Sequence, residues 1–304
     1  MQFSVQQAEV AAQLGLSATD TDTLTLVKRW LNTSQQTIIQ AAEWPFLRAS
    51  TPLIVQTETD ITTGTATTTA GSATVTFSVA PSSSSLTGYY LQTASSLDWY
   101  KITAHTGGAT SATISPAAIY SKSAGTYTIR KFYYATSSAV DRILQIRQSV
   151  TPFQLEEKDK EAFDKMKPNP SETGTPLIYM MAGKNSSDVW QFIVWPTPDS
   201  VANLYVEYLQ AATDLSADSD VSIIPAKWHT SVMIQGAIWQ GYNFLDDSRV
   251  DAARQNFFNG IEGMKVEMFP SRSDSHVMQP VDIQQPLFPF PLPDQYGLQG
   301  RQDF

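Results

Sequence analysis

Apolar residues recur with the period of a helix between residues 224 and 269. They fall at spacings of three and four in two runs, which start at Ile234 and Val250 and are separated by an acidic pair. Such spacing places apolar side chains on one face of each helix, and Ser248 is a suitable N-cap for the second. The pattern therefore predicts a helical hairpin. Its two apolar faces consist of Ile234, Ala237, Ile238, Gly241, Tyr242 and Leu245, and of Val250, Ala253, Phe257, Ile261, Met264 and Met268.

The first fifty residues carry a similar helical pattern. We expect a short helix that Ser4 caps and Gly15 ends, because serine accepts bonds from free N–H groups and glycine adopts the left-handed backbone of a C-cap. A longer helix is expected from Asp22 to Glu43, where apolar residues again share one face. Pro45 stops this helix, since proline has no N–H and restricts the residue before it.

Residues 51–138 have a different composition. They are rich in Thr, Ser and Ala, carry few charges, and contain short stretches in which apolar and polar residues alternate. Alternation of this kind is typical of strands with one buried face. Short strands at close spacing predict a small β-sandwich or barrel. The expected strands cover residues 74–77, 89–92, 99–102, 112–114 and 127–130.

The part of the chain between this segment and the hairpin mixes strand and helix patterns. A charged helix is expected from Glu156 to Met166, with Phe163 turned inward. A proline-set turn at residues 196–199 separates the last two of four strands. Those strands are expected at residues 144–148, 177–182, 190–195 and 204–209.

The final segment, residues 270–304, alternates proline with large apolar residues and has no helical period. Proline favours extended backbone, and large apolar groups left in water mark interaction sites. We therefore predict an extended arm that docks on a partner, with wrapping of its own domain as the alternative. The partner-binding residues of this arm would be Leu287, Phe288, Phe290, Leu292, Tyr296 and Phe304.

The order of these elements resembles a known family. The strand and turn GTPLIYMMAG and WQFIVWPTPD, the tyrosine-rich strand NLYVEYLQ, an acidic loop and the words IPAKWH come before the helical hairpin. This order is similar to that of the head-to-tail adaptor (connector) proteins of tailed bacteriophages. The resemblance covers residues 1–50 and 140–269, and treats the segment between them as an insertion.

The resemblance implies an α+β fold with a helical-bundle adaptor core, a small β-sheet element, an inserted β-sandwich or barrel and an extended C-terminal arm. Residues 1–50 would supply the N-terminal helices of the core, and residues 51–138 the inserted module. Residues 139–269 would complete the core with strands and the helical hairpin, and residues 270–304 would be the arm.

It also implies a structural virion protein. Copies of the chain would form a dodecameric ring between the portal and the tail, assembled in the host cytoplasm, and line the channel through which DNA is retained and released. Its partners would be other copies, the portal protein, and tail, nozzle or tail-fibre proteins. No cofactor, metal or membrane is implied. The helices would pack into the ring through Trp30, Trp228, Trp239, Tyr242, Phe257 and Phe258.

Charge and composition narrow this picture. The formal net charge of −9 argues against tight binding of DNA, because that affinity comes from Lys and Arg that release counterions. The chain contains no cysteine, which removes disulfides and thiolate chemistry. No apolar run is long enough to predict a membrane span.

The residues predict neither a metal-binding site nor a catalytic site. Asp214, Asp218 and Asp220 resemble an oxygen-ligand loop, but the glycine and glutamate of a calcium-binding EF-hand are missing. The three histidines lie far apart, and His229 is expected to pack or cap rather than act as a base. No nucleophile, base and orienting group occur together, so no enzyme is predicted.

A carbohydrate-binding role is the main alternative to the adaptor. Aromatic residues of the 51–138 segment could form a sugar-stacking platform in a tail-fibre or tailspike attachment subunit. Strand cores use the same residue types, so a core role for them is also open. The residues in question are Tyr89, Tyr90, Trp99 and Tyr100.

Overall fold

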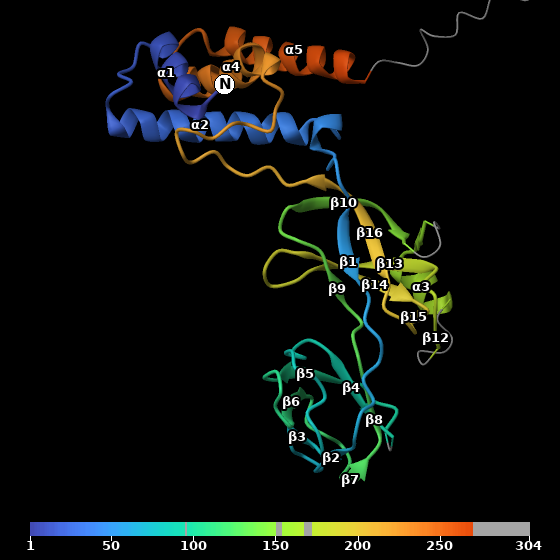
Figure 1. Ribbon diagram of the computed structural model, residues 1–304. Helices are drawn as coiled ribbons and strands as arrows, with labels where there is room; N and C mark the ends of the chain where they lie inside the picture. Colours follow the sequence, from blue (N-terminus) through green and yellow to red (C-terminus); the bar gives the residue numbers. More distant parts are fainter. Residues whose placement is uncertain (95, 150–153, 167–171, 270–304) are drawn as a thin grey trace, which may run out of the picture.

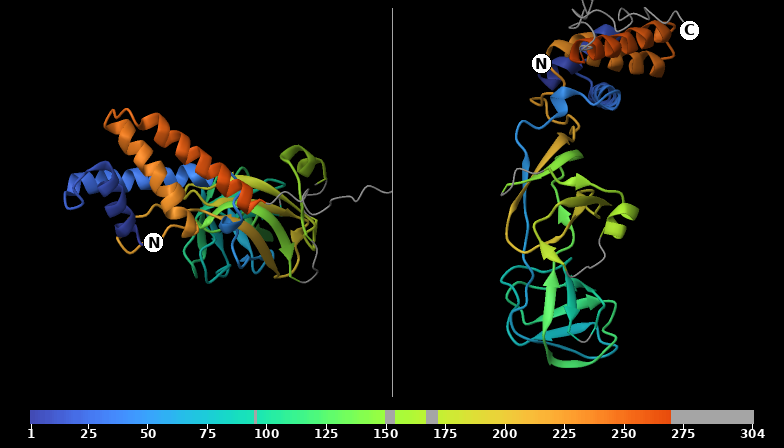
Figure 2. Two further views of the ribbon diagram at one scale, coloured as in Figure 1. Left: turned by 90° about the horizontal axis from the view of Figure 1, so that it is seen from above. Right: turned by 90° about the vertical axis from the view of Figure 1, so that its right-hand side faces the viewer.

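The computed structural model describes residues 1–94, 96–149, 154–166 and 172–269. These residues form three tiers along one long axis (Figure 1). A layer of helices occupies one end, a seven-stranded barrel occupies the other, and smaller sheets lie between them. The same order of tiers is visible from the side in Figure 2.

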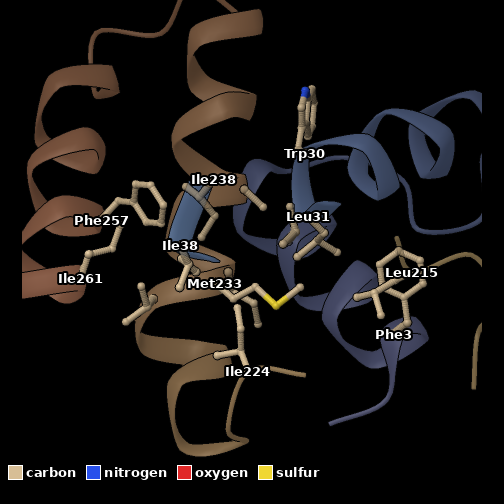
Figure 3. Close-up of a cluster of buried hydrophobic side chains, with 14 of the residues drawn as sticks. Phe3, Trp30, Leu31, Ile38, Leu215, Ile224, Met233, Ile238, Phe257 and Ile261 are labelled. Carbon is tan, nitrogen blue, oxygen red and sulfur yellow. The ribbon is translucent and has the colours of Figure 1, made fainter. Parts of the chain in front are cut away.

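The helical layer joins the two ends of the described chain. Helices α1 (Phe3–Leu14) and α2 (Thr21–Gln40) pack against α4 (Ile234–Phe244), and α5 (Val250–Met268) packs against α4 in turn. A π-helical turn over His229–Met233 leads into α4. Figure 3 shows the shared core, in which residues from α1, α2, α4 and α5 meet. Phe3, Leu31, Ile38, Met233, Ile234 and Phe257 are among its fully buried members.

The acidic loop before the hairpin caps α1. The first N–H groups of a helix have no partner within it. Here the N–H groups of Phe3 and Ser4 donate to the carbonyls of Asp220 (2.9 Å) and Asp218 (3.1 Å). The prediction that Ser4 caps this helix is therefore wrong, because a loop more than two hundred residues away supplies the acceptors. Gly15 ends the helix with φ of 70°, as predicted.

Helix α2 starts and ends slightly before its predicted bounds. The Asp20 carboxylate accepts a bond from the Thr23 N–H (3.0 Å) and so acts as the N-cap. At the other end the indole N–H of Trp44 donates to the Ile38 carbonyl (2.6 Å), and a short 3-10 turn follows over Pro45–Leu47. A fully buried Trp44 thus closes the helix against the core.

The helical hairpin is confirmed with two corrections. Both predicted faces are largely buried, but Leu245 is exposed because α4 ends at Phe244. Ser248 does not cap α5. Instead the Asp247 side chain accepts a bond from the Arg249 N–H (2.8 Å), and the Asp247 carbonyl accepts one from the Val250 N–H (3.1 Å).

The middle tier contains two sheets that share a hydrophobic cluster. One has the order β1 (Leu53–Gln56), β16 (Asn203–Gln210), β10 (Val140–Gln148), and is antiparallel throughout. The other has the order β11 (Glu156–Glu157), β13 (Ile178–Lys184), β14 (Trp190–Trp195), β9 (Tyr134–Ala135). The short strands β12 (Thr173–Gly174) and β15 (Thr197–Pro198) pair beside them, with helix α3 (Lys160–Met166) nearby.

These sheets overturn the predicted helical-bundle core. The fold is α+β overall, but strands dominate it, and helices α1, α2, α4 and α5 form only one of three tiers. The prediction treated the strands before the hairpin as a small attachment to the helices. They instead bury their own cluster, including Ile146, Phe192, Leu204 and Val206, so the middle tier has a core separate from that of the helices.

The expected helix at Glu156–Met166 also starts later than predicted. Glu156–Glu157 form strand β11, which pairs in parallel with β13. The Asp159 carboxylate accepts a bond from the Ala162 N–H (2.7 Å) and begins α3 at Lys160. Phe163 is buried, as expected.

The third tier is a nearly closed barrel. Exposed and buried residues alternate along its strands, which puts one face of each strand into a core of aliphatic and aromatic side chains. The strand order is β7 (Lys122–Gly125), β2 (Ala66–Thr68), β3 (Thr74–Phe77), β6 (Ser111–Ser115), β5 (Tyr100–Ala104), β4 (Tyr90–Thr93), β8 (Tyr127–Arg130).

Two chain passes join the barrel to the middle tier. The incoming pass leaves β1 and the returning pass leads from β8 to β9, and both β1 and β9 pair with strands of the middle sheets. Ile61 and Ile129 form a β-bridge where the passes enter the barrel. The division of the chain at residues 51 and 138 stays a prediction, and the strand pairing gives it sharper bounds to test.

Candidate interaction surfaces

Two of the six residues predicted to pack the helices into a ring are interior residues. Phe257 is fully buried and Trp30 is 7% exposed, and both belong to the helical core. The Trp30 ring also contacts Phe244, with 5.7 Å between ring centroids. These residues hold the helices of one chain together, so any effect on assembly would be indirect.

The other four residues lie at or near the surface of the helical layer. The Trp239 ring lies 5.8 Å from Phe257 and 5.7 Å from Phe258, and Phe258 is 41% exposed. The Arg249 guanidinium lies 4.4 Å from the centroid of the half-buried Tyr242 ring. The Lys227 ammonium lies 5.2 Å from the centroid of the Trp228 ring. Cations over ring faces of this kind favour the observed ring positions.

Helix α5 and the residue after it carry a second group of exposed apolar side chains, the outer stripe, of which only Phe258 was predicted from the sequence. Phe258, Val266 and Phe269 are all exposed, and Val266 is 76% exposed. Phe258 and Val266 are eight residues apart on the side of the helix that faces away from the buried Phe257 and Ile261. Phe269 follows the last helical residue, Met268, and its ring lies 5.7 Å from that of Trp44. A surface helix with one partner needs only one apolar face. Periodicity alone favours the inward face of α5, because that face holds more apolar residues at helical spacing.

A further exposed apolar pair lies at the end of α4. Phe244 is 61% exposed and Leu245 is also exposed. Periodicity placed Leu245 on the buried face, and the end of the helix turns it outward. Together with the outer stripe of α5, this pair makes the helical layer rich in large exposed apolar groups.

A buried polar link ties α1 to the hairpin. His229 is fully buried, and its Nε2 lies 2.7 Å from the Ile224 carbonyl while its Nδ1 lies 3.1 Å from Gln6 Nε2. The neutral ring satisfies both contacts when Nε2–H donates to the carbonyl and Nδ1 accepts from the Gln6 amide. Burial lowers the pKa of His229, while the Ile224 contact opposes that shift. The packing role expected for His229 is confirmed.

The acidic loop has structural partners for each carboxylate. Asp220 accepts bonds from the N–H groups of Ser216 and Ala217 (both 2.8 Å), which lowers its pKa. Asp218 pairs with Lys28 (3.5 Å), and Asp214 accepts from the Gln36 amide (3.1 Å). Among the described residues, no group of three acidic, histidine or cysteine side chains is placed to hold a metal.

A cleft of about 470 Å³ lies where the barrel meets the middle tier. The barrel contributes Tyr89, Tyr90 and Lys101, the returning pass contributes Lys131 and Tyr133, and β14 contributes Gln191. The proposed sugar platform is therefore split. Tyr89 and Tyr90 line the cleft, Tyr100 is in the barrel core, and Trp99 is not among the lining residues and has its ring 5.0 Å from Phe132.

A family model described as the SU10 adaptor protein matches residues 1–283. The chain belongs to the SU10 adaptor protein family. No curated protein matches the chain. The predicted resemblance to phage head-to-tail adaptors is thereby confirmed, and the matched range includes the barrel, which the resemblance had left out.

The SU10 adaptor match also extends beyond α5 into the predicted C-terminal arm. The six residues predicted to bind a partner there, from Leu287 to Phe304, lie outside the described residues, and outside the matched range too. None of the helices in the described part of this SU10 adaptor is long and apolar enough to cross a membrane.

Proposed function

We propose that this SU10 adaptor connects the phage head to the tail as an oligomeric ring between the portal protein and the tail. Copies of the chain contact each other through their helical layers. The family membership and the outer apolar stripe of α5 support this proposal. Its role is structural, and no catalytic step belongs to it.

The outer stripe is the observation that carries the proposal. Full burial of one large apolar side chain contributes about 1.5–3 kcal/mol relative to exposure. The stripe and the pair at the end of α4 therefore offer a favourable contact surface that one chain alone leaves in water. A neighbouring subunit, repeated around a ring, can cover such a surface on every copy.

The charge of the chain suits a passage for DNA better than a binding site for it. A net charge of −9 repels phosphates, so the duplex can move through the ring without being held. We expect no measurable affinity for duplex DNA at physiological salt, where even non-specific binders reach only about 10⁻⁴ to 10⁻⁶ M. A salt-sensitive band shift with duplex DNA would contradict this part of the proposal.

The C-terminal segment is proposed as the arm that reaches a partner in the virion neck. It follows α5, which ends at Met268, and the next residue, Phe269, lies beside Trp44, with 5.7 Å between ring centroids. Truncation after Met268 should leave a folded subunit that binds portal or tail proteins poorly. If truncation instead lowers the melting temperature of the free subunit by many degrees, the segment belongs to its own fold.

Assembly with the portal tests the proposal directly. Purified subunits are mixed with portal protein, and complexes are counted by electron microscopy of negatively stained particles. Val266→Asp and Phe258→Asp place a charge in the outer stripe and should abolish rings while the far-ultraviolet circular dichroism of the subunit stays unchanged. Leu97→Asp is the matched control, because Leu97 is 93% exposed but lies in a barrel loop.

Two results would contradict the proposal. One is a full yield of rings from both stripe variants. The other is a wild-type subunit that stays monomeric with portal present and is absent from purified virions.

A further inference from the structure

We propose that the cleft between the barrel and the middle tier binds carbohydrate, as a mono- or disaccharide unit of a surface glycan. The unit is neutral or carries a single carboxylate. This inference does not depend on the ring, since the cleft lies away from the helical layer.

The size and lining of the cleft fit such a ligand. Its volume of about 470 Å³ falls within the range of about 300–1,000 Å³ that is typical of small-molecule sites. Three tyrosines line it, and each combines an apolar ring face with a polar hydroxyl group. A pyranose has the same mixed character, with C–H groups on its faces and hydroxyl groups around its edge.

The aromatic rings at the cleft are held in place by their neighbours. The Tyr90 ring lies 5.2 Å from Phe132 and 5.9 Å from Tyr133. The Tyr89 hydroxyl donates to the Glu58 carboxylate, and the Lys131 ammonium lies 5.5 Å from the centroid of the Tyr89 ring. Because these contacts fix the rings before a ligand arrives, little conformational entropy is lost on binding.

Two polar side chains that line the cleft have no protein partner in the part of the chain that the structure describes. Lys101 and Gln191 both line it, and neither side chain has a hydrogen-bond partner or ion pair among the described residues. They come from opposite sides, Lys101 from the barrel and Gln191 from the middle tier. An ammonium and an amide placed in this way suit the hydroxyl groups or the carboxylate of a sugar.

The charged residues around the cleft disfavour the binding of nucleic acid. Glu58 pairs with Lys131 (2.6 Å), and Asp60 accepts two bonds from Arg130 (2.8 and 2.6 Å). These carboxylates neutralise two of the three cations around the cleft and would repel phosphates. Affinity for nucleic acid requires several uncompensated cations, whereas a sugar requires at most one.

The test uses the full chain on an array of bacterial surface oligosaccharides, followed by calorimetric titration of the best ligand. We expect binding that changes little with salt. Tyr90→Ala should lower the affinity about tenfold through loss of the ring contact, and Gln191→Ala should lower it from the other side of the cleft. Tyr120→Ala is the matched control, since Tyr120 is a barrel tyrosine that is exposed outside the cleft.

A second set of variants separates binding from folding. Tyr90→Phe keeps the ring and should retain most of the affinity, and the melting temperature of each free variant shows whether it folds. Three results overturn the proposal: no array member binds, binding is unchanged by Tyr90→Ala and Gln191→Ala, or a single-stranded oligothymidine binds the cleft more tightly than any sugar.

Discussion

The helical layer and the barrel lie at opposite ends of the same chain and use different residues (Figure 1). The helical layer buries large side chains such as Trp44, Met233 and Phe257, and still leaves the α5 stripe and Phe244 in water. The barrel encloses a smaller cluster with an exterior rich in Ser and Thr, and its exposed apolar residues lie on loops between its strands. The first surface is suited to contacts between proteins, and the second to an independent module.

Two deletions test whether the barrel is independent. Removal of residues 62–128 cuts the chain beside the Ile61–Ile129 bridge, where the N–H of Ile61 donates to the carbonyl of Ile129 (2.9 Å). Since the cut ends are adjacent, a short linker should leave cooperative unfolding of the remaining tiers intact. Removal of residues 51–138 takes β1 and β9 as well, exposes β16, and should abolish that transition in circular dichroism. Equal behaviour of the two deletions would contradict the strand pairing seen here.

Core truncations should affect one tier and spare the other. Phe257→Ala should lower the free energy of unfolding of the helical layer by about 3–5 kcal/mol. Leu91→Ala should lower that of the barrel by about 2–5 kcal/mol. Both residues are fully buried, so each variant serves as the control for the other. Amide hydrogen exchange locates the change, and loss of protection in both tiers from either variant would show that they fold as one unit.

A pair of glycines offers a smaller and more local test. A Cβ at Gly236 in α4 would lie 2.2 Å from Ser34 Oγ and 2.6 Å from Phe257 Cε2. Gly236→Ala should therefore destabilise the helical layer by about 1–3 kcal/mol through overpacking. Gly263→Ala in α5 meets no atom within 4 Å and should stabilise it by about 0.5–1 kcal/mol, because alanine favours the helix. Thermal melting compares them, and a stabilising Gly236→Ala would contradict the close approach of α2 and α4.

His229 gives the smallest expected effect, and it depends on pH. Folding lowers the pKa of His229 below the unfolded value of about 6.5. The folded state therefore prefers the neutral ring. The stability that neutral His229 contributes to folding is fully present above the unfolded pKa of about 6.5, and it is lost as the pH falls from there through the folded pKa.

The measurement compares denaturant unfolding of the wild type and His229→Asn from pH 8 to pH 5. The difference in free energy of unfolding between the two proteins should be constant near pH 8 and should shrink towards pH 5. The barrel transition should show no matching change. A difference that stays constant across the whole range would show that His229 does not titrate in this way.

Local elements were predictable because their signals are local. The face of α5 that includes Ile261, the strand at Trp190–Trp195 and the left-handed Gly15 all follow from spacing or from one residue type. The adaptor family was also predictable, since the order of strand, turn and hairpin can be recognised directly in the sequence. The starts of helices were less predictable, because the groups that cap them can be distant in sequence, as the Asp220 carbonyl is from the start of α1.

The arrangement of elements was harder to predict. Nothing near Leu53 in the sequence indicates that it pairs with Val206, and this pairing makes the middle tier a unit with its own core. The predicted helical-bundle core failed for that reason. The prediction of candidate surfaces was limited in the same way. Phe258 was predicted, whereas the exposure of Val266 depends on which face of α5 the other helices cover.

The central claim is that contacts between subunits belong to the helical layer. Hydrogen–deuterium exchange of the free subunit and of the assembled portal complex tests it across the whole chain. The account predicts that amides of residues 244–269 gain protection on assembly while those of residues 66–130 exchange at the same rate in both states. New protection confined to the barrel, with α5 unchanged, would contradict it.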